Sequence, residues 1–295
     1  MVIFIFLFLA YLLSILGNLT IIILTLVAPH LKTPMCFFLW NFSFLEVSFT
    51  SIFIPKLLTS LTTGNKVISF AGCLTQYFFA ILLGATEFYL LTSMSYVHYV
   101  AIYKPLHYLT IMSSRGCIQL VFCSWLGGAL AILPPIILIS QMGFCASNVL
   151  NQYYCDYRPL LEVACSDTSL LELVVIFLAV LTLVATLLLV TLSYTYIIRT
   201  ILRITSAQQR TKASATVPPT WLSSHSLMAA ASFIHEPITK KGGNFDKEIS
   251  LLMTSVSPLL NPFIYTLRNQ QVNQAFKNTV KKNYKILIII MYYFN

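Results

Sequence analysis

Two carboxylic acids lie inside stretches of the sequence that are otherwise apolar. Glu46 and Glu87 are the only acidic residues that lie well inside such stretches. An ionisable side chain is costly at the depth of a bilayer, and it usually has a partner or a hydrated cavity there. The alternative is that one or both acids are protonated and simply hydrogen-bonded. Either way, the two residues mark a polar site inside an apolar protein.

The cysteines indicate disulfide chemistry. The chain has seven of them, and none follows a metal-ligand spacing such as Cys-x-x-Cys. Cys145, Cys155 and Cys165 fall in one polar segment, which indicates disulfides on an oxidising face, with free thiols as the alternative. The sequence shows no nucleophile–base pair and no metal-ligand set, so we do not expect an enzyme.

The composition is typical of a protein that crosses a membrane several times. Of 295 residues, 58% are hydrophobic and 9% are charged, and the mean hydropathy is +0.81. Soluble domains carry roughly 25% charged residues. The net charge of +9 raises the question of nucleic-acid binding, but no domain-sized polar segment exists to carry a basic face. We therefore expect the lipid bilayer, and no nucleic acid, as a partner.

Six apolar stretches are long enough to cross the bilayer. They are predicted at 2–27, about 36–58, about 73–99, about 117–139, 170–204 and about 249–267. Between the last two, 217–234 is a poor candidate because it contains Pro218, Pro219 and several polar residues, which need partners inside hydrocarbon. The expected fold is an all-α membrane protein, a seven-transmembrane helix bundle with a degraded sixth helix. The bundle takes up residues 1–285, and 286–295 form a short apolar tail.

Lysine and arginine set the expected orientation. With the N-terminus outside, Lys104, Arg115 and Arg199 all lie in or beside cytoplasmic connections, as the positive-inside rule requires. Acidic residues such as Asp156 and Asp167 then lie on the other side. We expect a multi-pass plasma-membrane protein with an extracellular N-terminus.

Two motifs point to one family. The third stretch ends in Tyr96-Val97-His98-Tyr99 and continues to Lys104-Pro105-Leu106-His107-Tyr108, and the last stretch contains Asn261-Pro262-Phe263-Ile264-Tyr265. Both resemble olfactory receptors, in particular family 6, a branch of the rhodopsin-like G-protein-coupled receptors. The resemblance covers nearly the whole chain, from the first helix to Phe276. The Asn-Pro pair can form a hinge with two states, and Asn261, Pro262 and Tyr265 are its implied switch residues.

The chain departs from the family at the G-protein end of the third helix. The family carries Asp and Arg where this chain has Val97 and His98. In the family that Arg alternates between the acid and the G protein. The resemblance gives His98 and Tyr99 this place, but His98 is a shorter, titrating cation. The alternative, which we favour, is that His98 is a tolerated interfacial residue without a switching role.

The resemblance also implies two disulfides. Cys73 at the start of the third helix would pair with Cys155 in the long loop. Cys145 and Cys165 would then form the extra bridge of olfactory receptors.

For the two buried acids, the resemblance implies a sodium pocket. Glu46 and Glu87 would line it together with Asn18, Ser257 and Asn261. Protonated, hydrogen-bonded acids remain the alternative, and no other cofactor is expected.

A ligand pocket for a small hydrophobic odorant is implied among helices three, five, six and seven. The pocket residues would be Ile81, Gly84, Ala85, Leu178, Thr182, Leu251 and Thr254. The alternative for all of them is ordinary helix–helix packing, since small residues favour close approach.

The predicted function is an odorant receptor that couples to a stimulatory heterotrimeric G protein, impaired by the lost Asp-Arg pair and the aberrant sixth helix. The alternative is a non-signalling product of a decayed receptor gene. The segments 217–221 and 227–232 both match family codons read with one base missing, so we hypothesise a shifted frame over about 214–232. A transporter is disfavoured because the sequence shows no internal repeat.

Overall fold

The structure, a computed structural model, describes residues 2–64, 67–144, 155, 160–161, 163–203, 259–261 and 272–278. Within this part of the chain, five helices are long and apolar enough to cross a membrane. They are α1 (Val2–Val27), α2 (Pro34–Thr63), α3 (Phe70–Tyr103), α5 (Ser114–Ser140) and α7 (Ser169–Leu202). The first five predicted spans are therefore confirmed as helices.

The remaining predicted spans fall largely outside this part. The predicted sixth helix at 217–234 and the tail at 286–295 lie outside the described residues. Of the predicted span at 249–267, residues 259–261 are described, and they are helical. Residues 272–278 form a further helical stretch. Short helices fill two connections: η1 (Pro29–Leu31) lies between α1 and α2, and η2 (Pro105–His107) with α4 (Tyr108–Ile111) lies between α3 and α5.

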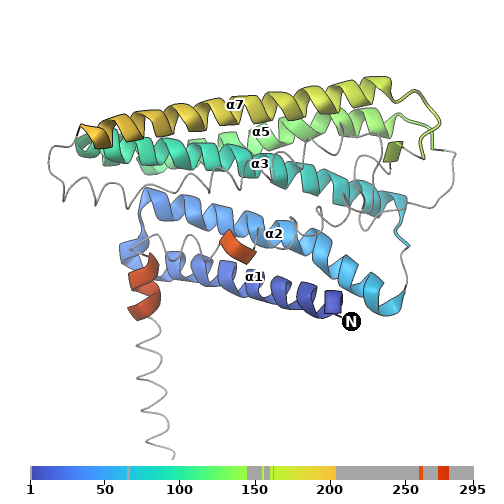
Figure 1. The fold of residues 1–295 in the computed structure, drawn as a ribbon, viewed down its shortest axis with the longest axis horizontal. Helices are drawn as coiled ribbons and strands as arrows, with labels where there is room; N and C mark the ends of the chain where they lie inside the picture. Colours follow the sequence, from blue (N-terminus) through green and yellow to red (C-terminus); the bar gives the residue numbers. More distant parts are fainter. Residues whose placement is uncertain are drawn as a thin grey trace, which may run out of the picture.

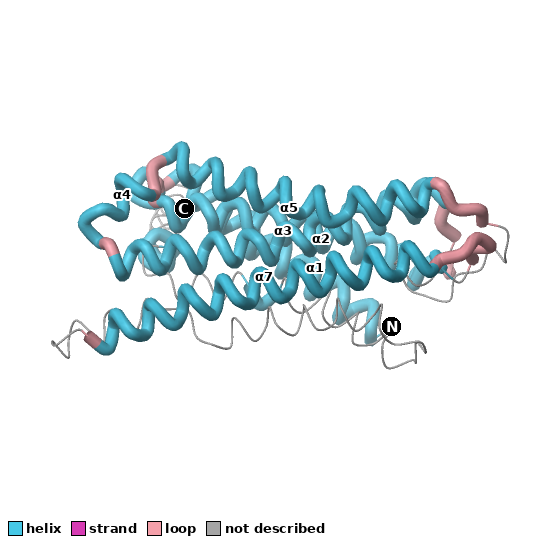
Figure 2. The backbone as a smooth tube through the Cα atoms, turned by 90° about the horizontal axis from the view of Figure 1, so that it is seen from above, coloured by secondary structure: helices cyan, strands magenta, loops and turns pink. Residues whose placement is uncertain are grey.

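Helix α3 occupies the middle of the described bundle. It packs against α2, α5 and α7, whereas α1 packs mainly against α2. Figure 1 shows α3 between the α1–α2 pair and the α5–α7 pair. Figure 2, turned by 90°, shows the long helices running alongside one another. Residues on different faces of α3 are therefore brought to different neighbours.

Capping residues decide where the helices begin. The side chains of Thr33, Ser69 and Ser113 accept hydrogen bonds from backbone N–H groups of the first turns of α2, α3 and α5. These caps place the helix starts two or three residues earlier than the first apolar residues had suggested. At the start of α7, Asp167 accepts from the backbone and the hydroxyl of Ser169, and these bonds lower its pKa.

Hydroxyl groups within the spans bond to their own helix. The Thr20, Thr25 and Thr50 hydroxyls donate to carbonyl oxygens one turn earlier. These bonds within one helix satisfy the threonine hydroxyl groups inside the hydrocarbon region, where there is no water to bond to them. These three hydroxyl residues are thus compatible with the membrane and need no ligand as a partner.

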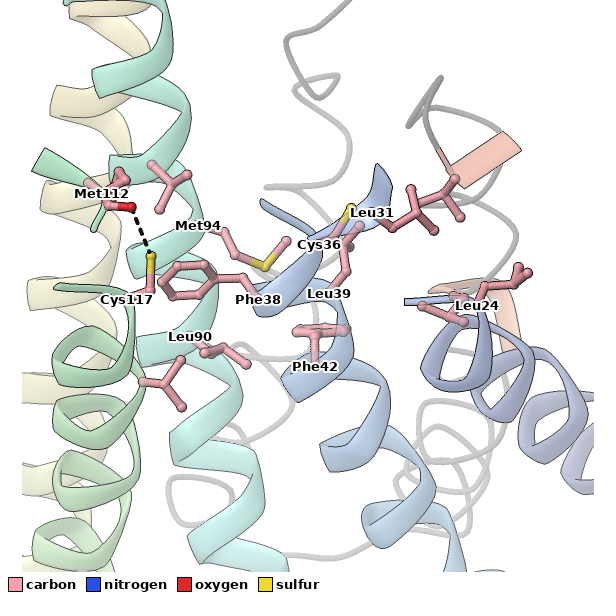
Figure 3. Close-up of a cluster of buried hydrophobic side chains, with 14 of the residues drawn as sticks. Leu24, Leu31, Cys36, Phe38, Leu39, Phe42, Leu90, Met94, Met112 and Cys117 are labelled. Atoms are coloured by element: carbon pink, nitrogen blue, oxygen red, sulfur yellow. Dashed lines mark hydrogen bonds between the residues drawn. The ribbon is translucent and has the colours of Figure 1, made fainter. Parts of the chain in front are cut away.

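Apolar packing is concentrated in two clusters. The Tyr103-end cluster joins α1, α2, α3 and α5 through buried residues that include Leu24, Phe38, Phe42, Met94 and Val97, and the helical stretch 272–278 adds Val272 and Ala275. Figure 3 shows this cluster, with the Cys117 thiol donating to the Met112 carbonyl oxygen at 3.7 Å. The Cys73-end cluster joins α3, α5, α7 and the loop between α5 and α7 through Cys73, Tyr77, Ile132, Ile139, Cys155, Leu160 and Leu171.

Close approach of α3 and α5 requires a glycine. A Cβ atom added at Gly128 would clash with the Thr86 hydroxyl oxygen and would lie 2.8 Å from the Leu82 carbonyl oxygen. The second contact is with backbone, which cannot move aside without shifting α3. The Ser93 and Ser124 hydroxyls, 3.2 Å apart, add a hydrogen bond along the same contact.

We predict that Gly128→Leu destabilises the protein, because the new side chain must push α3 and α5 apart. Overpacking a close contact costs about 1–3 kcal/mol or more. The thermal unfolding midpoint of the detergent-purified variant should fall accordingly. Cys123→Leu, at an exposed position on the same helix, is the matched control and should leave the midpoint nearly unchanged. Equal midpoints for the two variants would contradict the close contact.

Candidate functional site: a buried acid pair and the two ends of the third helix

Glu46 has a hydrogen-bond partner from the far end of the sequence. The Asn261 side-chain amide donates to Glu46 Oε1 across 215 positions of sequence. Both residues are buried, with exposed fractions of 2% for Glu46 and 8% for Asn261. The bond connects α2 to the helical residues 259–261. It also confirms the expectation that an acid at this depth has a partner.

Glu87, on α3, is the second acid of this site. It is half-buried, and its carboxyl interacts electrostatically with that of Glu46. Two carboxyl groups close together in an apolar bundle repel each other unless a proton or a cation neutralises their charge. Asn18, also implied in this site, is 1% exposed, and its side-chain amide donates to the Ser14 carbonyl oxygen within α1. Ser257 lies outside the described residues.

The predicted disulfide between Cys73 and Cys155 is confirmed. It connects residues 82 positions apart, with their Cα atoms separated by 5.2 Å. Cys155 is buried, with an exposed fraction of 3%, so the bridge holds one point of the loop inside the Cys73-end cluster. Cys165 is also disulfide-bonded. Its predicted partner, Cys145, lies outside the described residues, so that pairing stays a prediction.

The predicted ligand residues are only partly brought together. Ile81, Gly84 and Ala85 lie on α3, where Gly84 and Ala85 are buried and Ile81 packs against the Cys73-end cluster. Leu178 and Thr182 lie half-buried on α7, which packs against α3. Leu251 and Thr254 fall outside the described residues. A cavity among these residues therefore stays a prediction.

Thr182 has a partner that the sequence did not reveal. Its hydroxyl lies 3.1 Å from the Tyr89 hydroxyl, so a hydrogen bond connects α3 to α7 within the apolar bundle. Gly127 of α5 lies against the Tyr89 ring, which an added Cβ would meet at 2.9 Å. Tyr89 is two residues beyond Glu87, but nothing in its sequence context distinguishes a cross-helix tyrosine from a lipid-facing one.

Four tyrosines gather at the Tyr103 end of α3. Tyr99 stacks on Tyr103 with ring centroids 5.2 Å apart, and it also contacts Tyr96 and, on α7, Tyr196. His98 is half-buried beside this tyrosine cluster, whereas Val97 is buried in the Tyr103-end cluster. The predicted switch residues Pro262 and Tyr265 lie outside the described residues. The signal that sequence reasoning passed over is the helical spacing of 96, 99 and 103.

The connection between α3 and α5 presents apolar side chains outward. Leu106 and Leu109 have exposed fractions of 93% and 74%. Met112, by contrast, is buried, and Tyr108 packs against the same Tyr103-end cluster. Burial of Tyr108, with smaller effects of the Cys117 and Cys36 thiols, raises the pKa of its hydroxyl to about 12. Tyr108 thus stays neutral and holds the connection while the two leucines project from it.

Comparisons with known proteins agree on one family. The family model described as "Olfactory receptor" matches residues 7–283. Olfactory receptor 6C4 of Homo sapiens is 73% identical over 290 residues, which cover 96% of this chain and 92% of that receptor. Olfactory receptor 2AP1 of Homo sapiens is 66% identical over 286 residues, covering 95% of this chain and 91% of the relative. Olfactory receptor 6C3 of Homo sapiens is 55% identical over 287 residues, with coverage of 95% and 91%.

We predict that Asn261→Leu lowers the free energy of unfolding by about 1–3 kcal/mol, because it leaves the Glu46 carboxyl buried without its donor. Removing both partners in Glu46→Leu/Asn261→Leu should recover part of this loss, since no polar group is then left unpaired. Thermal unfolding in detergent measures both effects. Leu260→Ala, at a more exposed neighbouring position, controls for loss of packing. A double variant with the summed loss of the two single variants would show that the two residues do not interact.

Proposed function

The chain belongs to the olfactory receptor family, and from this premise we propose that it binds a small hydrophobic odorant between α3 and α7. The family is one of odorant-sensing G-protein-coupled receptors, not of enzymes, and its members are multi-pass plasma-membrane proteins. We further propose an extracellular N-terminus, which places the Cys73 end of α3 outside and the Tyr103 end inside. The disulfide at the Cys73 end supports this orientation, because such bridges persist on oxidising faces.

The observation that carries the odorant proposal is the packing of α7 on α3, where the predicted ligand residue Thr182 of α7 lies against Tyr89 of α3. Ile81, Gly84 and Ala85 of α3 are apolar, with little side-chain volume at Gly84 and Ala85, and Leu178 lies one turn before Thr182 on α7. The Thr182 and Tyr89 hydroxyls add hydrogen-bonding groups to this region. An apolar site with few polar groups suits a small volatile molecule. Leu251 and Thr254 would complete it.

For signalling, we propose the connection between α3 and α5 as the docking point of a stimulatory heterotrimeric G protein. The projecting Leu106 and Leu109 support this, because exposed apolar side chains on an anchored segment suit a protein partner. Coupling is expected to be weak. Val97 supplies no acid, and His98 replaces the family's Arg, so the charge-based switch at this end is missing. The helix expected at 217–234, with its two prolines, adds to the impairment.

A second candidate is a non-signalling product of a decayed receptor gene. The observation that favours it is again Val97, which lies in the Tyr103-end cluster with an exposed fraction of 1%. The fold there is completed by packing, without the charged pair that signalling in the family uses. The weakly coupling receptor and the non-signalling product would have the same fold and would differ only in whether they couple to a G protein.

One experiment separates binding from coupling. A panel of small volatile alcohols, aldehydes and esters is screened by ligand-induced shifts of the thermal midpoint in purified protein, and cyclic AMP is measured in cells expressing the chain. We expect a hit to raise the midpoint while cyclic AMP rises little. The double revertant Val97→Asp/His98→Arg should not restore the response, because the introduced carboxylate would enter an apolar cluster and the sixth helix would remain aberrant.

Two variants control this experiment. Gly84→Leu should abolish the shift by filling the proposed site, whereas Leu188→Ala, at an exposed position of α7, should retain it. A midpoint shift that survives Gly84→Leu would reject the proposed site. A robust cyclic AMP response from the unaltered chain would reject the impairment and the decayed-gene candidate together.

We also propose that Glu46 and Glu87 hold a sodium ion together with the Asn261 side chain. Carboxylate and amide oxygens are suitable ligands for a hard cation. The residues present fit because the Asn261 amide lies against the buried Glu46 carboxyl, and the Glu87 carboxyl is near enough to interact with it. A cation there would neutralise the repulsion between the acids and stabilise α2 against α3.

Sodium should therefore raise the thermal midpoint relative to choline at equal ionic strength. A ligand present at 100 times its dissociation constant adds about 2.7 kcal/mol to stability. Glu87→Gln should abolish the sodium shift, and Asp167→Asn, which removes an exposed acid outside the bundle, should retain it. If Glu87→Gln shows the wild-type shift, the acids are neutralised by protons and the sodium proposal is wrong.

A further inference from the structure

Gln76 is a buried polar residue on α3 that the proposed function leaves unused. Its side chain has an exposed fraction of 7%. It lies one turn after Cys73, on the face of α3 that turns toward α2 and toward the loop between α5 and α7. Both ends of its amide group are engaged, and they are engaged by different elements.

One end of Gln76 holds the loop. Its Oε1 accepts a hydrogen bond from the backbone N–H of Cys155 at 3.0 Å, in a buried position. The disulfide to Cys73 alone attaches the loop through a chain of rotatable single bonds. The hydrogen bond adds a second attachment, to the backbone itself, and so fixes the Cys155 backbone against α3.

The other end of Gln76 holds α2. Its Nε2 donates to the Ile52 carbonyl oxygen at 3.2 Å. Ile52 lies in the turn that precedes Pro55, and Pro55 is inside α2. A proline lacks an N–H and crowds the preceding turn, so carbonyl groups there are open to partners from other helices.

We propose that Gln76 is a positioning residue that fixes Cys155 to both α2 and α3. The position of Cys155 shapes the proposed odorant site, because Cys155 belongs to the Cys73-end cluster against which Ile81 packs. That link to the ligand rests on the proposed function. The positioning of Cys155 by Gln76 does not rest on the proposed function, because it is supported by two hydrogen bonds and by the burial of Gln76.

Hydrogen–deuterium exchange of the full-length protein in detergent tests whether Gln76 holds Cys155 in place. The readout is the exchange of the peptide that contains Cys155. Gln76→Leu should lose about tenfold in protection, the factor that corresponds to one hydrogen bond. Gln76→Glu keeps an oxygen that can accept from Cys155 N–H but loses the donor to the Ile52 carbonyl oxygen. It should therefore lose less protection than Gln76→Leu. Thr75→Val, at the adjacent exposed position, should not change the exchange.

Gln76→Asn keeps the amide but shortens its reach, and it should lose protection even if the leucine variant does not fold. Wild-type protection in the Leu or Asn variant, or a loss in Gln76→Glu as large as in Gln76→Asn, would overturn the proposal. These results are independent of ligand binding. If no odorant shifts the thermal midpoint but the exchange pattern is the expected one, the proposed ligand site is rejected and the proposed role of Gln76 stands.

Discussion

The structure depends on one constraint: a polar group inside hydrocarbon must find its partner within the protein. Most hydroxyl residues of the spans meet it locally, by bonding to the preceding turn of their own helix. A carboxyl or carboxamide side chain has more bonding capacity, and here it bonds across helices. Glu46 reaches Asn261, and Gln76 reaches both α2 and the loop. The same cost that makes such residues rare therefore makes them determine which helices are held together.

These cross-links converge on α3. Its Cys73 end carries the disulfide and Gln76, its middle carries Glu87 and Tyr89, and its other end carries the tyrosine cluster. Its contact with α5, by contrast, is close because Gly128 has no side chain. The central helix thus meets α2, α5 and α7 through different chemistry: amide and carboxyl groups, the absence of a side chain, and aromatic rings. The exposed faces of α5 and α7 are rich in leucine and other apolar residues, such as Leu126, Leu130, Leu188 and Leu192.

Composition and apolar length were sufficient to predict the five long helices, because the bilayer itself dictates both. The partnered Glu46 was predictable for the same reason, and the Cys73–Cys155 bridge followed from the family resemblance. The helix starts were misplaced because Thr33, Ser69 and Ser113 cap the helices two or three residues before the predicted starts. The bond between Tyr89 and Thr182 could not be predicted, because it depends on how two distant helices rotate against each other. A single sequence contains no measure of that rotation.

At the Tyr103 end, apolar and aromatic side chains occupy the place where the family carries a charged pair. A charged pair there contributes to switching only if its members are free to exchange partners, and such freedom adds little to stability. Val97 instead adds apolar contact to a cluster that already joins α1, α2, α3 and α5. The stacked rings of Tyr99 and Tyr103, with Tyr196 against them, add contact between α3 and α7. Apolar and aromatic packing at this end therefore stabilises the observed arrangement of the helices, and under the proposed impairment of coupling it would favour that arrangement over a second state that a G protein recognises.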